Sequence, residues 1–530
     1  MQNKVSNLSQ KDIFVASIDI GTNSTHLLIA QINLELKSFS IKFTEKSTTR
    51  LGERDEEGNL REESIQKVLS TLRRFKDYCS SYDVNQILAA ATSAVRESSN
   101  GGELISRIKE DIGFDVELIS GVEEARLIYL GVLSGMALEE KSYVIIDIGG
   151  GSTELILANN QDTKALTSSR VGAVRLKNDF FVDNNLSKSR VNFLKTFIKG
   201  SLEPSVGKIK NRLKRNESIT LIATSGTATT LGNLIAYQLT QSKQKMQGYK
   251  FSKSNLEMIL QTMINMSHSE KRQEFPLLSE RRAEIIIPGA LILDTSMEML
   301  QADELTISER ALREGLVVDW MIRRGMLKRK FSVQSNVRKT TVLHQAEKFA
   351  VDKSRSERVS RLAFSIYDQT KNILHNDLNE KGRNLLWAAC YLYTCGKQIN
   401  LSAYHKHSWY LIRNFELLGY SQAETNIIAG IARYHRKTFP KKRHESWQIL
   451  ETREDKNIVL EMSLILRLAS SLDKRPDPSI SSVEIELLNN ELSFKIIPSD
   501  LNIDLLLERW SLESCSGALR EFKNLELKVC

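Results

Sequence analysis

Ile18-Asp19-Ile20-Gly21-Thr22-Asn23-Ser24-Thr25-His26-Leu27-Leu28-Ile29-Ala30 is a stretch that returns 128 residues later as Ile146-Asp147-Ile148-Gly149-Gly150-Gly151-Ser152-Thr153-Glu154-Leu155-Ile156-Leu157-Ala158. Eight of the thirteen positions are identical. In each copy a strand pattern ends on Asp, turns at Gly, presents hydroxyl groups and enters a second apolar strand pattern. An internal repeat of this kind predicts two similar lobes whose hairpin tips face each other across a cleft.

The residue types in the repeat indicate chemistry on phosphate. Glycines let a backbone approach a ligand closely, and a row of turn N–H groups forms a cradle for an anion. Asp19 and Asp147 stand at the strand ends, where a carboxylate can hold a hydrated metal ion. A single Asp-Ile-Gly is a common turn, but two copies with the same Ser-Thr pair favour a binding site.

Composition indicates a globular protein of several domains. A chain of 530 residues is too long for one core and predicts three or four domains. Apolar residues make up 41% and charged residues 26%, as in ordinary globular proteins. The net charge of +9 suits a polyanionic partner, although it is spread over a long chain. The five cysteines are scattered and form no CxxC pair, so the sequence predicts neither a disulfide framework nor a zinc knuckle.

Location is predicted from the polar N-terminus and the absence of a long apolar run. Residues 1–11 are polar and lead into no signal-peptide-like apolar region. The most apolar stretch, residues 285–293, contains Pro288 and is too short to span a bilayer. We therefore expect a cytoplasmic protein without a membrane span.

Strand and helix patterns alternate over residues 13–130 and again over residues 142–320, which predicts an α/β sandwich in each lobe. The first lobe should hold strands at 14–20, 26–32, 41–44, 86–91 and 115–119, and a helix at 122–134. In the second, we expect strands at 143–148 and 220–223. A small-residue turn should follow, with a helix beginning at about Thr230.

The C-terminal part has a different character. From about Ala311 to 472 the apolar spacing is helical, and Arg475-Pro476-Asp477-Pro478 then breaks the pattern. Alternating residues on both sides of Asn489-Asn490 predict a hairpin in a small α+β domain. The predicted domains are therefore 1–133, 134–320, 321–474 and 475–530.

Several motifs in a fixed order resemble one known family. They are Asp19–Ser24, Thr92-Ser93-Ala94-Val95-Arg96, Ile119–Leu127, Asp147–Glu154, Ser225-Gly226-Thr227 and Ala311-Leu312-Arg313-Glu314-Gly315. The chain is similar over nearly its whole length to the exopolyphosphatase / guanosine pentaphosphate phosphohydrolase family, and most to its long, four-domain exopolyphosphatases. The resemblance implies two actin/sugar-kinase-like (ribonuclease H-like) lobes, an all-helical HD-like domain and a small α+β domain. It also implies a homodimer formed through the helical domain.

The two hairpins supply the candidate phosphate-binding and metal-binding groups. Hydrolysis of a terminal phosphoanhydride requires the phosphoryl group to be held still and its charge to be neutralised. Asp19 and Asp147 are the expected partners of Mg²⁺ or another divalent cation. The candidate phosphate-binding residues of the hairpins are Gly21, Thr22, Asn23, Ser24, Gly149, Gly150, Gly151 and Ser152.

Two glutamates are candidates for the reaction itself. Glu124 begins a helix after the Ser120-Gly121 turn, where it could orient or activate water or could simply cap the helix, as Glu123 could. The resemblance gives the water-activating role to Glu124. Glu154 stands where the first hairpin has His26, and it could bind metal or position water.

Further phosphate contacts are expected from an arginine and a helix terminus. Arg96 follows a strand, where its guanidinium could grip a phosphate or form an ordinary salt bridge. Ser225, Gly226 and Thr227 place small donors at a predicted helix start, which suits either phosphate binding or simple capping. The resemblance favours phosphate binding for Arg96.

Two runs of basic residues lie in the helical part. The first comprises Arg323, Arg324, Lys328, Arg329, Lys330, Arg338 and Lys339, and the second lies between Ala432 and His444 without an acid. Such runs are usually solvated faces, but a long polyphosphate would need a track of this kind and a nucleotide would not. The predicted polyphosphate track is Arg433, Arg436, Lys437, Lys441 and Lys442.

A second metal site is not expected. The segment 359–396 is similar to an HD phosphohydrolase scaffold, but the ligand positions of that scaffold hold Arg355, Tyr393, Thr394 and Ser470. These residues are poor ligands for a divalent cation, and cations flank the nearby His405 and His407.

The leading hypothesis is an exopolyphosphatase that releases orthophosphate from the end of inorganic polyphosphate with Mg²⁺. The alternative within the family is hydrolysis of guanosine pentaphosphate (pppGpp). A polyphosphate-binding regulator without turnover is disfavoured by the intact acidic residues, and a kinase would need an adenosine pocket that the sequence does not identify. No nucleic-acid partner is expected.

Overall fold

The computed structural model describes residues 13–181, 187–214, 217–266, 275, 277–327, 337–376 and 379–530. The chain divides into two compact units, Met1–Val337 (unit 1) and Arg338–Cys530 (unit 2), each of which is treated by itself. Residues 1–11 and the basic residues Lys328, Arg329 and Lys330 lie outside the described residues.

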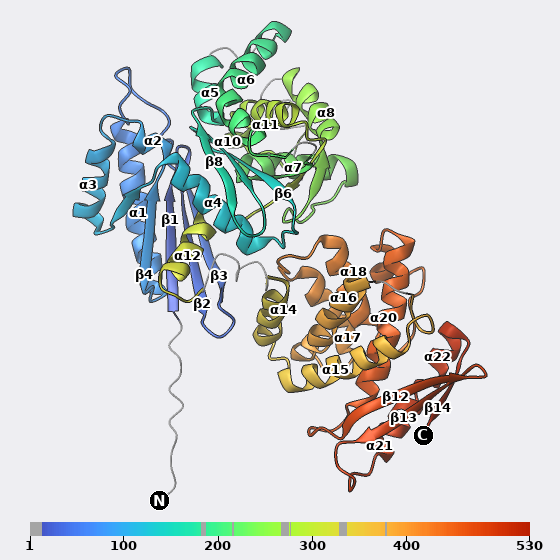
Figure 1. Ribbon diagram of the computed structural model, residues 1–530. Coiled ribbons are helices and arrows are strands. Elements are labelled where there is room, and N and C mark those ends of the chain that lie inside the picture. The colour runs from blue at the N-terminus through green and yellow to red at the C-terminus, as the bar shows by residue number, and fades with distance from the viewer. Residues whose placement is uncertain are drawn as a thin grey trace, which may run out of the picture. The chain divides into compact units, whose positions relative to one another are not determined.

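The first sheet of unit 1 is built on the first copy of the repeat (Figure 1). Its strand order is β3-β2-β1-β4-β5. The first three strands form an antiparallel meander, and β4 and β5 continue it in parallel with β1. The bounds are β1 Ile13–Ile20, β2 Ser24–Asn33, β3 Ser38–Thr48, β4 Gln86–Ala91 and β5 Val116–Leu118. All five lie at the predicted places, although β3 is longer than the sequence pattern indicated.

The second sheet repeats this arrangement with the second copy. Its order is β10-β11-β9-β6-β7-β8, and its meander β6-β7-β8 again continues through parallel strands. Asp147 pairs with Glu154 across the second hairpin at the register where Asp19 pairs with His26 in the first. The bounds are β6 Ser142–Ile148, β7 Thr153–Ala158, β8 Thr163–Ser169, β9 Ile219–Thr224, β10 Lys250–Ser252 and β11 Glu304–Ile307.

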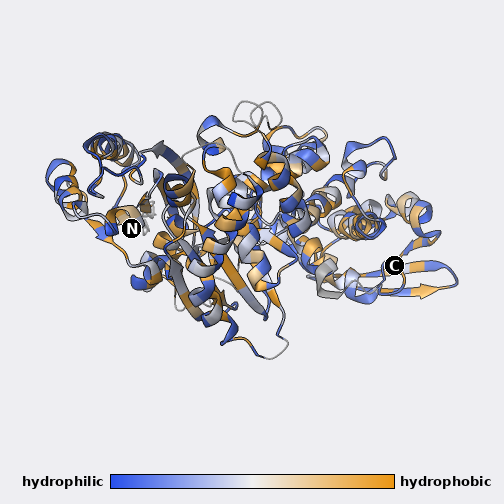
Figure 2. Cartoon of the chain, turned by 90° about the horizontal axis from the view of Figure 1, so that it is seen from above, coloured by the Kyte–Doolittle hydropathy of each residue, from blue (hydrophilic) through white to orange (hydrophobic). Residues whose placement is uncertain are grey.

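Helices cover both sheets. The outer face of the first sheet packs on α1 (Glu62–Ser81) and α3 (Gly101–Ile112), and the second sheet packs on α6 (Lys188–Lys210), α7 (Ser225–Thr240), α8 (Lys253–Ile264) and α11 (Ile286–Leu300). The apolar stretch 285–293 lies almost entirely in α11 and is buried. Three short helices are α2 (Ser93–Arg96), α5 (Ala173–Phe180) and α10 (Glu280–Ala283). Figure 2 shows hydrophobic residues concentrated along the strands.

Two helices lie between the sheets and join the lobes. The helices α4 (Gly121–Gly135) and α12 (Leu312–Arg323) share one core with residues of both sheets. A Cβ atom on Gly131 would lie 1.9 Å from the carbonyl oxygen of Ala311, and one on Gly315 would lie 1.9 Å from that of Leu127. The glycines therefore let α4 and α12 cross at backbone contact.

The predicted start of α7 is wrong. We expected the helix to begin at about Thr230, after a small-residue turn, but it begins at Ser225. The hydroxyls of Thr229 and Thr230 donate to the carbonyls of Ser225 and Gly226, so the small residues take part in the first helical turns. Strands β8, β10 and β11 were not assigned from the sequence.

Unit 2 combines helices with a small sheet over one continuous core. Its helices are α14 Val337–Lys348, α15 Lys353–Gln369, α16 Asn379–Leu392, a 3₁₀ turn η1 Cys395–Gln398, α17 Tyr404–Asn414, α18 Gln422–Tyr434, α19 Glu445–Gln448 and α20 Arg453–Leu472. The sheet pairs β12 (Ile480–Leu488) with β13 (Glu491–Pro498), and β13 with β14 (Glu526–Val529). Two further helices are α21 Leu506–Glu513 and α22 Ser516–Lys523.

The predicted hairpin in unit 2 is confirmed. Asn489 and Asn490 connect β12 and β13 with φ angles of 47° and 68°, which Asn tolerates better than most residues. The boundaries between the four domains drawn from the sequence remain predictions. Within the part of the chain that the structure describes, no helix is long and apolar enough to cross a bilayer.

Candidate active site

The two hairpin tips have the same internal geometry. The N–H of Gly21 donates to the carbonyl of Ser24 at 3.1 Å, and the N–H of Gly149 donates to that of Ser152 at 2.9 Å. Each aspartate therefore stands immediately before a turn closed by the same backbone hydrogen bond. The repeat seen in the sequence is a repeat of local structure.

The tips face each other, as predicted, but at Thr22, Gly150 and Gly151 they touch where a cleft was expected. The hydroxyls of Thr22 and Ser93 lie 2.9 Å apart in the first lobe. A Cβ atom on Gly151 of the second lobe would lie 2.5 Å from the Ser93 Oγ and 3.0 Å from the Thr22 Oγ1. A Cβ on Gly150 would lie 2.8 Å from that of Thr22. Only glycine fits this approach without displacing the opposite hairpin.

The two aspartates lie at the base of the hairpins with their carboxylates largely withdrawn from water. Burial raises the pKa of Asp19 to about 7, and the nearby Asp147 raises it further while Arg313 opposes the change. Burial likewise raises the pKa of Asp147 to about 6. The Oδ1 atom of Asp19 is buried and has no hydrogen-bond partner among the described residues.

Glu124 is placed on the first turn of α4 but does not cap the helix. The Ser120 hydroxyl accepts a hydrogen bond from the N–H of Glu123, and Glu123 itself binds Arg126 at 2.7 Å. Glu124 is only 8% exposed, and its Oε2 lies 3.5 Å from Arg96 without a hydrogen bond. The helix cap therefore consists of the Ser120 hydroxyl and the N–H of Glu123. Glu124 keeps a buried carboxylate whose Oε2 makes no hydrogen bond.

Glu154 is the second buried glutamate. It lies on β7 with 1% of its surface exposed and accepts a hydrogen bond from the Ser168 hydroxyl at 2.7 Å. Burial and the neighbouring Asp147 raise the pKa of Glu154 to about 8. Burial, Glu154 and Asp19 in turn raise the pKa of Glu124 well above its usual value. The site thus gathers acids that repel one another.

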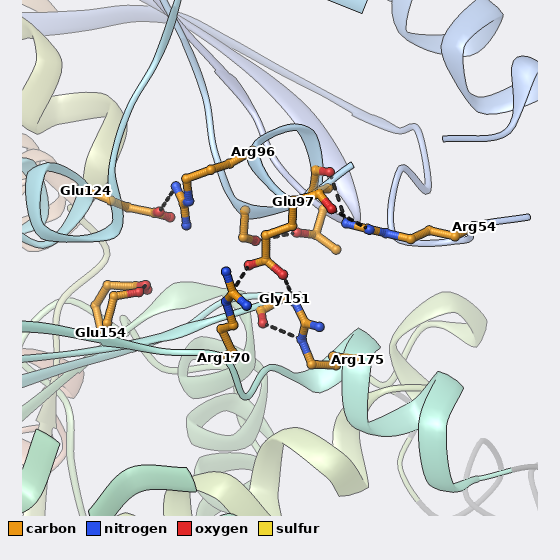
Figure 3. A network of polar contacts seen from close by, with 12 residues as sticks. Arg54, Arg96, Glu97, Glu124, Gly151, Glu154, Arg170 and Arg175 are labelled. Atoms are coloured by element: carbon orange, nitrogen blue, oxygen red, sulfur yellow. Dashed lines mark hydrogen bonds and ion pairs between the residues drawn. The ribbon is translucent and has the colours of Figure 1, made fainter. Parts of the chain in front are cut away.

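Charged residues at α2 and α5 lie beside these acids, and the pair of Glu97 and Arg175 connects the lobes (Figure 3). Arg96 donates to the carbonyl of Ile119 at 2.6 Å and points toward Glu124. Next to it, Glu97 binds Arg175 of the second lobe at 2.5 Å, and Arg170 lies 3.9 Å away. Arg175 also donates to the carbonyl of Gly151 at 3.0 Å. Glu97 and Arg175 therefore clamp the second hairpin tip to the first lobe.

The Ser225–Thr227 segment divides into two parts. Thr227 is buried, and a Cβ on Gly289 of α11 would lie 2.5 Å from its methyl carbon. Gly226 lies directly against Arg282, since a Cβ there would be 1.9 Å from the Arg282 Nη2. Thr227 therefore packs within the lobe, and Ser225 and Gly226 are half-buried beside a guanidinium.

Two arginines of the site were missed from the sequence. Arg313 acts on Asp19 and on His26, whose pKa burial lowers to about 2 so that the ring stays neutral. Arg313 lies in the Ala311–Gly315 motif, which contributed to the family resemblance, but the sequence assigned no function to this arginine. Arg282 precedes an apolar helix in an ordinary charged segment, and no pattern in the sequence marked it.

In unit 2 the predicted polyphosphate track consists of two kinds of side chain. Lys437, Lys441 and Lys442 are exposed. Arg433 and Arg436 are half-buried, and their guanidinium groups lie over the rings of Tyr434 and Tyr404. The track members are close in sequence, but the structure does not place them relative to unit 1.

At the four positions aligned with the HD ligands, Arg355 pairs with Asp473 at 3.3 Å, Tyr393 and Thr394 are buried, and Ser470 donates to the Arg467 carbonyl. Among the described residues, no three His, Cys, Asp or Glu side chains converge in a ready-made metal site.

Duplicated lobes with glycine hairpins and buried acids at their junction define a phosphohydrolase of the actin-like class. Family models agree: the Ppx/GppA phosphatase family matches residues 28–324, and its domain III matches residues 337–516. The chain belongs to the Ppx/GppA phosphatase family.

Solved structures support this assignment. The Ppx/GppA family member of Aquifex aeolicus is 28% identical, with a TM-score of 0.51, over 59% of this chain and 99% of that one. An exopolyphosphatase from Cytophaga hutchinsonii is also 28% identical, with a TM-score of 0.54, over 59% of this chain and 98% of the other. Family membership makes the protein a hydrolase of phosphoanhydride bonds.

Proposed function

We propose that the protein is an exopolyphosphatase, which hydrolyses the terminal phosphoanhydride of inorganic polyphosphate and releases orthophosphate. The observation that carries the proposal is the group of four acids next to Arg96 at the junction of the hairpins: the buried Glu124 and Glu154 and the half-buried Asp19 and Asp147. A module that only bound a polyanion would gain nothing from buried acids, because they repel phosphate. Acids here suit a site that activates water and holds a cation.

The hairpins and arginines would hold the terminal phosphate. Backbone N–H groups of Thr22–Ser24 and Gly150–Ser152 and the hydroxyls of Thr22 and Ser152 would donate to its oxygens from both lobes, whereas the N–H groups of Gly21 and Gly149 close the hairpin turns. Arg96 would add a charge-assisted contact. Ser225 and Gly226, beside Arg282, would hold phosphate at the start of α7.

Glu124 would act as the general base. It would take a proton from a water molecule whose oxygen attacks the terminal phosphorus, while the bond from that phosphorus to the bridging oxygen breaks and the shortened chain leaves. A raised pKa brings the carboxylate closer to the operating pH, which suits this role. Glu154, fixed by the Ser168 hydroxyl, would position the water from the second lobe.

Mg²⁺ or another divalent cation fits the same residues. Four carboxyl groups face two arginines, Arg96 and Arg313, and the buried Oδ1 of Asp19 has no hydrogen-bond partner among the described residues. Asp19, Asp147 and Glu154 would hold the ion, in part through water. When bound, the ion would neutralise charge on the phosphate oxygens.

Polyphosphate is favoured over pppGpp by the basic track of unit 2. Its three lysines are exposed, and residues 432–443 contain no acid. Such a track can neutralise successive phosphates of a polymer, and it has no use for a nucleotide. The similarity to an exopolyphosphatase supports the same choice. Hydrolysis of pppGpp remains the alternative, and the homodimer and the cytoplasmic location remain proposals from the sequence.

A three-substrate assay tests the proposal. Orthophosphate release is measured from long polyphosphate, short polyphosphate and pppGpp, first with the wild type. The variant carries Gln at Arg436, Lys437, Lys441 and Lys442. The charge-matched control carries Gln at four cations of unit 2 outside the track, Arg361, Arg453, Lys456 and Lys528.

The track variant should bind long polyphosphate more weakly and with a shallower salt dependence, because fewer counterions are released. Short polyphosphate and pppGpp should be hydrolysed as before, since their phosphates would lie wholly between the hairpins. Equal losses on all three substrates would make the track structural. A wild type that prefers pppGpp would replace the proposed function with its alternative.

A further inference from the structure

Cations from separate parts of unit 2 gather around one tyrosine. Tyr404 begins α17, and its hydroxyl lies 3.0 Å from the Nε2 of His435. The Nζ of Lys397 lies 5.4 Å from the centre of the Tyr404 ring, and the guanidinium carbon of Arg436 lies 4.8 Å from it. Lys397 comes from η1 and Arg436 from the end of α18, so the fold brings both to the same ring.

Two more cations belong to this group. Besides burial, Arg355, Arg436 and Lys474 lower the pKa of Lys397. Lys474 is exposed at the surface, and partial loss of water around its ammonium group together with Arg355 and Arg436 lowers its pKa. The four cations are therefore close enough to repel one another. We call Arg355, Lys397, Arg436 and Lys474 the Tyr404 cation cluster.

Few acids oppose this charge. Asp473 is buried and pairs with Arg355 at 3.3 Å, but Arg358 shares it at 2.6 Å. Asp352 acts on Lys397 only over a longer distance. Within the described part of unit 2, Lys397, Arg436 and Lys474 have no carboxylate at ion-pair distance. The cluster is positively charged on balance.

This cluster differs from an ordinary charged face. A solvated run of lysines is contiguous in sequence and points into water, as Lys441 and Lys442 do. The cluster instead assembles residues from α15, η1 and the ends of α18 and α20, and Lys397 and Arg436 are half-buried. Placing like charges together with partial loss of water is costly unless an anion joins them.

We propose that the Tyr404 cation cluster is a binding site for a phosphate group, separate from the site between the hairpins. A tetrahedral phosphate offers several acceptor oxygens, which match two guanidinium forks and two ammonium groups. The π face of the Tyr404 ring contacts Lys397 and Arg436 and so places the two cations next to each other. The phosphate comes either from free orthophosphate or from an internal segment of a polyphosphate chain.

Phosphate binding to the Tyr404 cation cluster can be measured without measuring hydrolysis. A negative result for this cluster is therefore distinct from a negative result for the proposed function. The full-length protein is treated with a limiting amine-acetylating reagent, and the rates at Lys397 and Lys474 are followed by peptide mass spectrometry. Orthophosphate or methylenediphosphonate, a non-hydrolysable diphosphate, is added at constant ionic strength. Acetylation of both lysines should slow about fivefold or more at saturation, while Lys456 on the first turns of α20 should be unaffected.

The two anions distinguish the two proposed sources of the phosphate group, the free ion and a polyphosphate segment. Protection by orthophosphate alone indicates a site for the free ion, and protection that requires the diphosphonate indicates a site for a chain segment. Equal protection by added chloride, or no protection by either anion, overturns the proposal.

Substitution adds a second check. Arg436→Gln should raise the half-protecting concentration about tenfold to a hundredfold, as expected for loss of a charge-assisted contact. Arg453→Gln is the matched control, because α20 has 20 residues and so places Arg453 about 30 Å from Lys474. If Arg436→Gln misfolds by circular dichroism, Lys397→Gln with Lys474 as the reporter replaces it. Unchanged protection in a folded variant overturns the assignment.

Discussion

Replacing Glu124 with glutamine should separate catalysis from stability. The amide keeps the shape of the side chain but cannot accept a proton from water. Loss of a well-placed general base lowers turnover about 10²–10⁴-fold, which raises the barrier by about 2.7–5.5 kcal/mol. Binding of polyphosphate should change little, since Arg96 and the hairpins stay in place.

The thermal stability of Glu124→Gln should not fall with its activity. Glu124 is 8% exposed, its Oε2 has no hydrogen bond, and Glu154 and Asp19 repel it. A neutral amide removes that repulsion, so the metal-free variant should melt at the same temperature as the wild type or higher. A general loss of structure would instead lower both activity and the melting temperature, which distinguishes the two explanations.

The neighbouring Glu123→Gln is the matched control. Glu123 lies on the same helical turn, and its ion pair with Arg126 is partly exposed, so its loss should cost at most about 1 kcal/mol and leave kcat near wild type. The assay is orthophosphate release at saturating polyphosphate, with melting followed by circular dichroism. Near wild-type kcat in Glu124→Gln, or a larger loss in Glu123→Gln, would refute the assignment of the base.

Three further predictions follow from individual residues. Gly151→Ala should destabilise the fold by about 1–3 kcal/mol and lower kcat, because the new Cβ would lie 2.5 Å from the Ser93 Oγ of the opposite lobe. The control is Gly102→Ala, whose Cβ would have nothing within 4 Å. In urea unfolding this variant should be as stable as the wild type or more stable. Asp147→Asn should raise the Mg²⁺ concentration for half-maximal rate, and an unchanged requirement would remove Asp147 from the site. Burial lowers the pKa of His435 to about 3 in the folded protein, below the value of about 6.5 in the unfolded chain. As pH falls below about 6.5 the unfolded chain therefore binds the proton first, and the free energy of unfolding decreases by about 2 kcal/mol at pH 5. His435→Gln should make the free energy of unfolding fall less between pH 7 and pH 5.

The repeated hairpin made much of unit 1 predictable. A period-two apolar strand, a glycine turn and a second strand are local features, and their recurrence predicted two equivalent sheets. The short strands β10 and β11 were missed because three or four residues are too few to show a period. The start of α7 was misplaced because Thr and Gly are weak helix formers, and the hydroxyl-to-carbonyl bonds that offset this are visible only in the fold.

The candidate site was predictable only in part. Asp19, Asp147 and Glu154 lie within the repeat, so their positions followed from the strand register. The clamp between Glu97 and Arg175 joins residues 78 positions apart, and the contact between Gly226 and Arg282 is likewise long-range. A charged residue in a helix or loop gives no local signal of such a partner. The sequence therefore predicted the hairpins and Arg96, but not Arg175, Arg282 or the role of Arg313.

The one position at which the two hairpins differ in charge gives the junction its polarity. His26 and Glu154 occupy the same register opposite Asp19 and Asp147. In the first lobe the neutral His26 lies near cations, and Arg313 offsets the charge of Asp19. In the second lobe the carboxylates of Glu154 and Asp147 repel each other, since Asp147 adds to the effect of burial in raising the pKa of Glu154. We propose that the second lobe stabilises the cation, while Arg96 of the first lobe faces the same junction. The one charge difference between the duplicated hairpins would then provide one side for the metal ion and one for the phosphate anion.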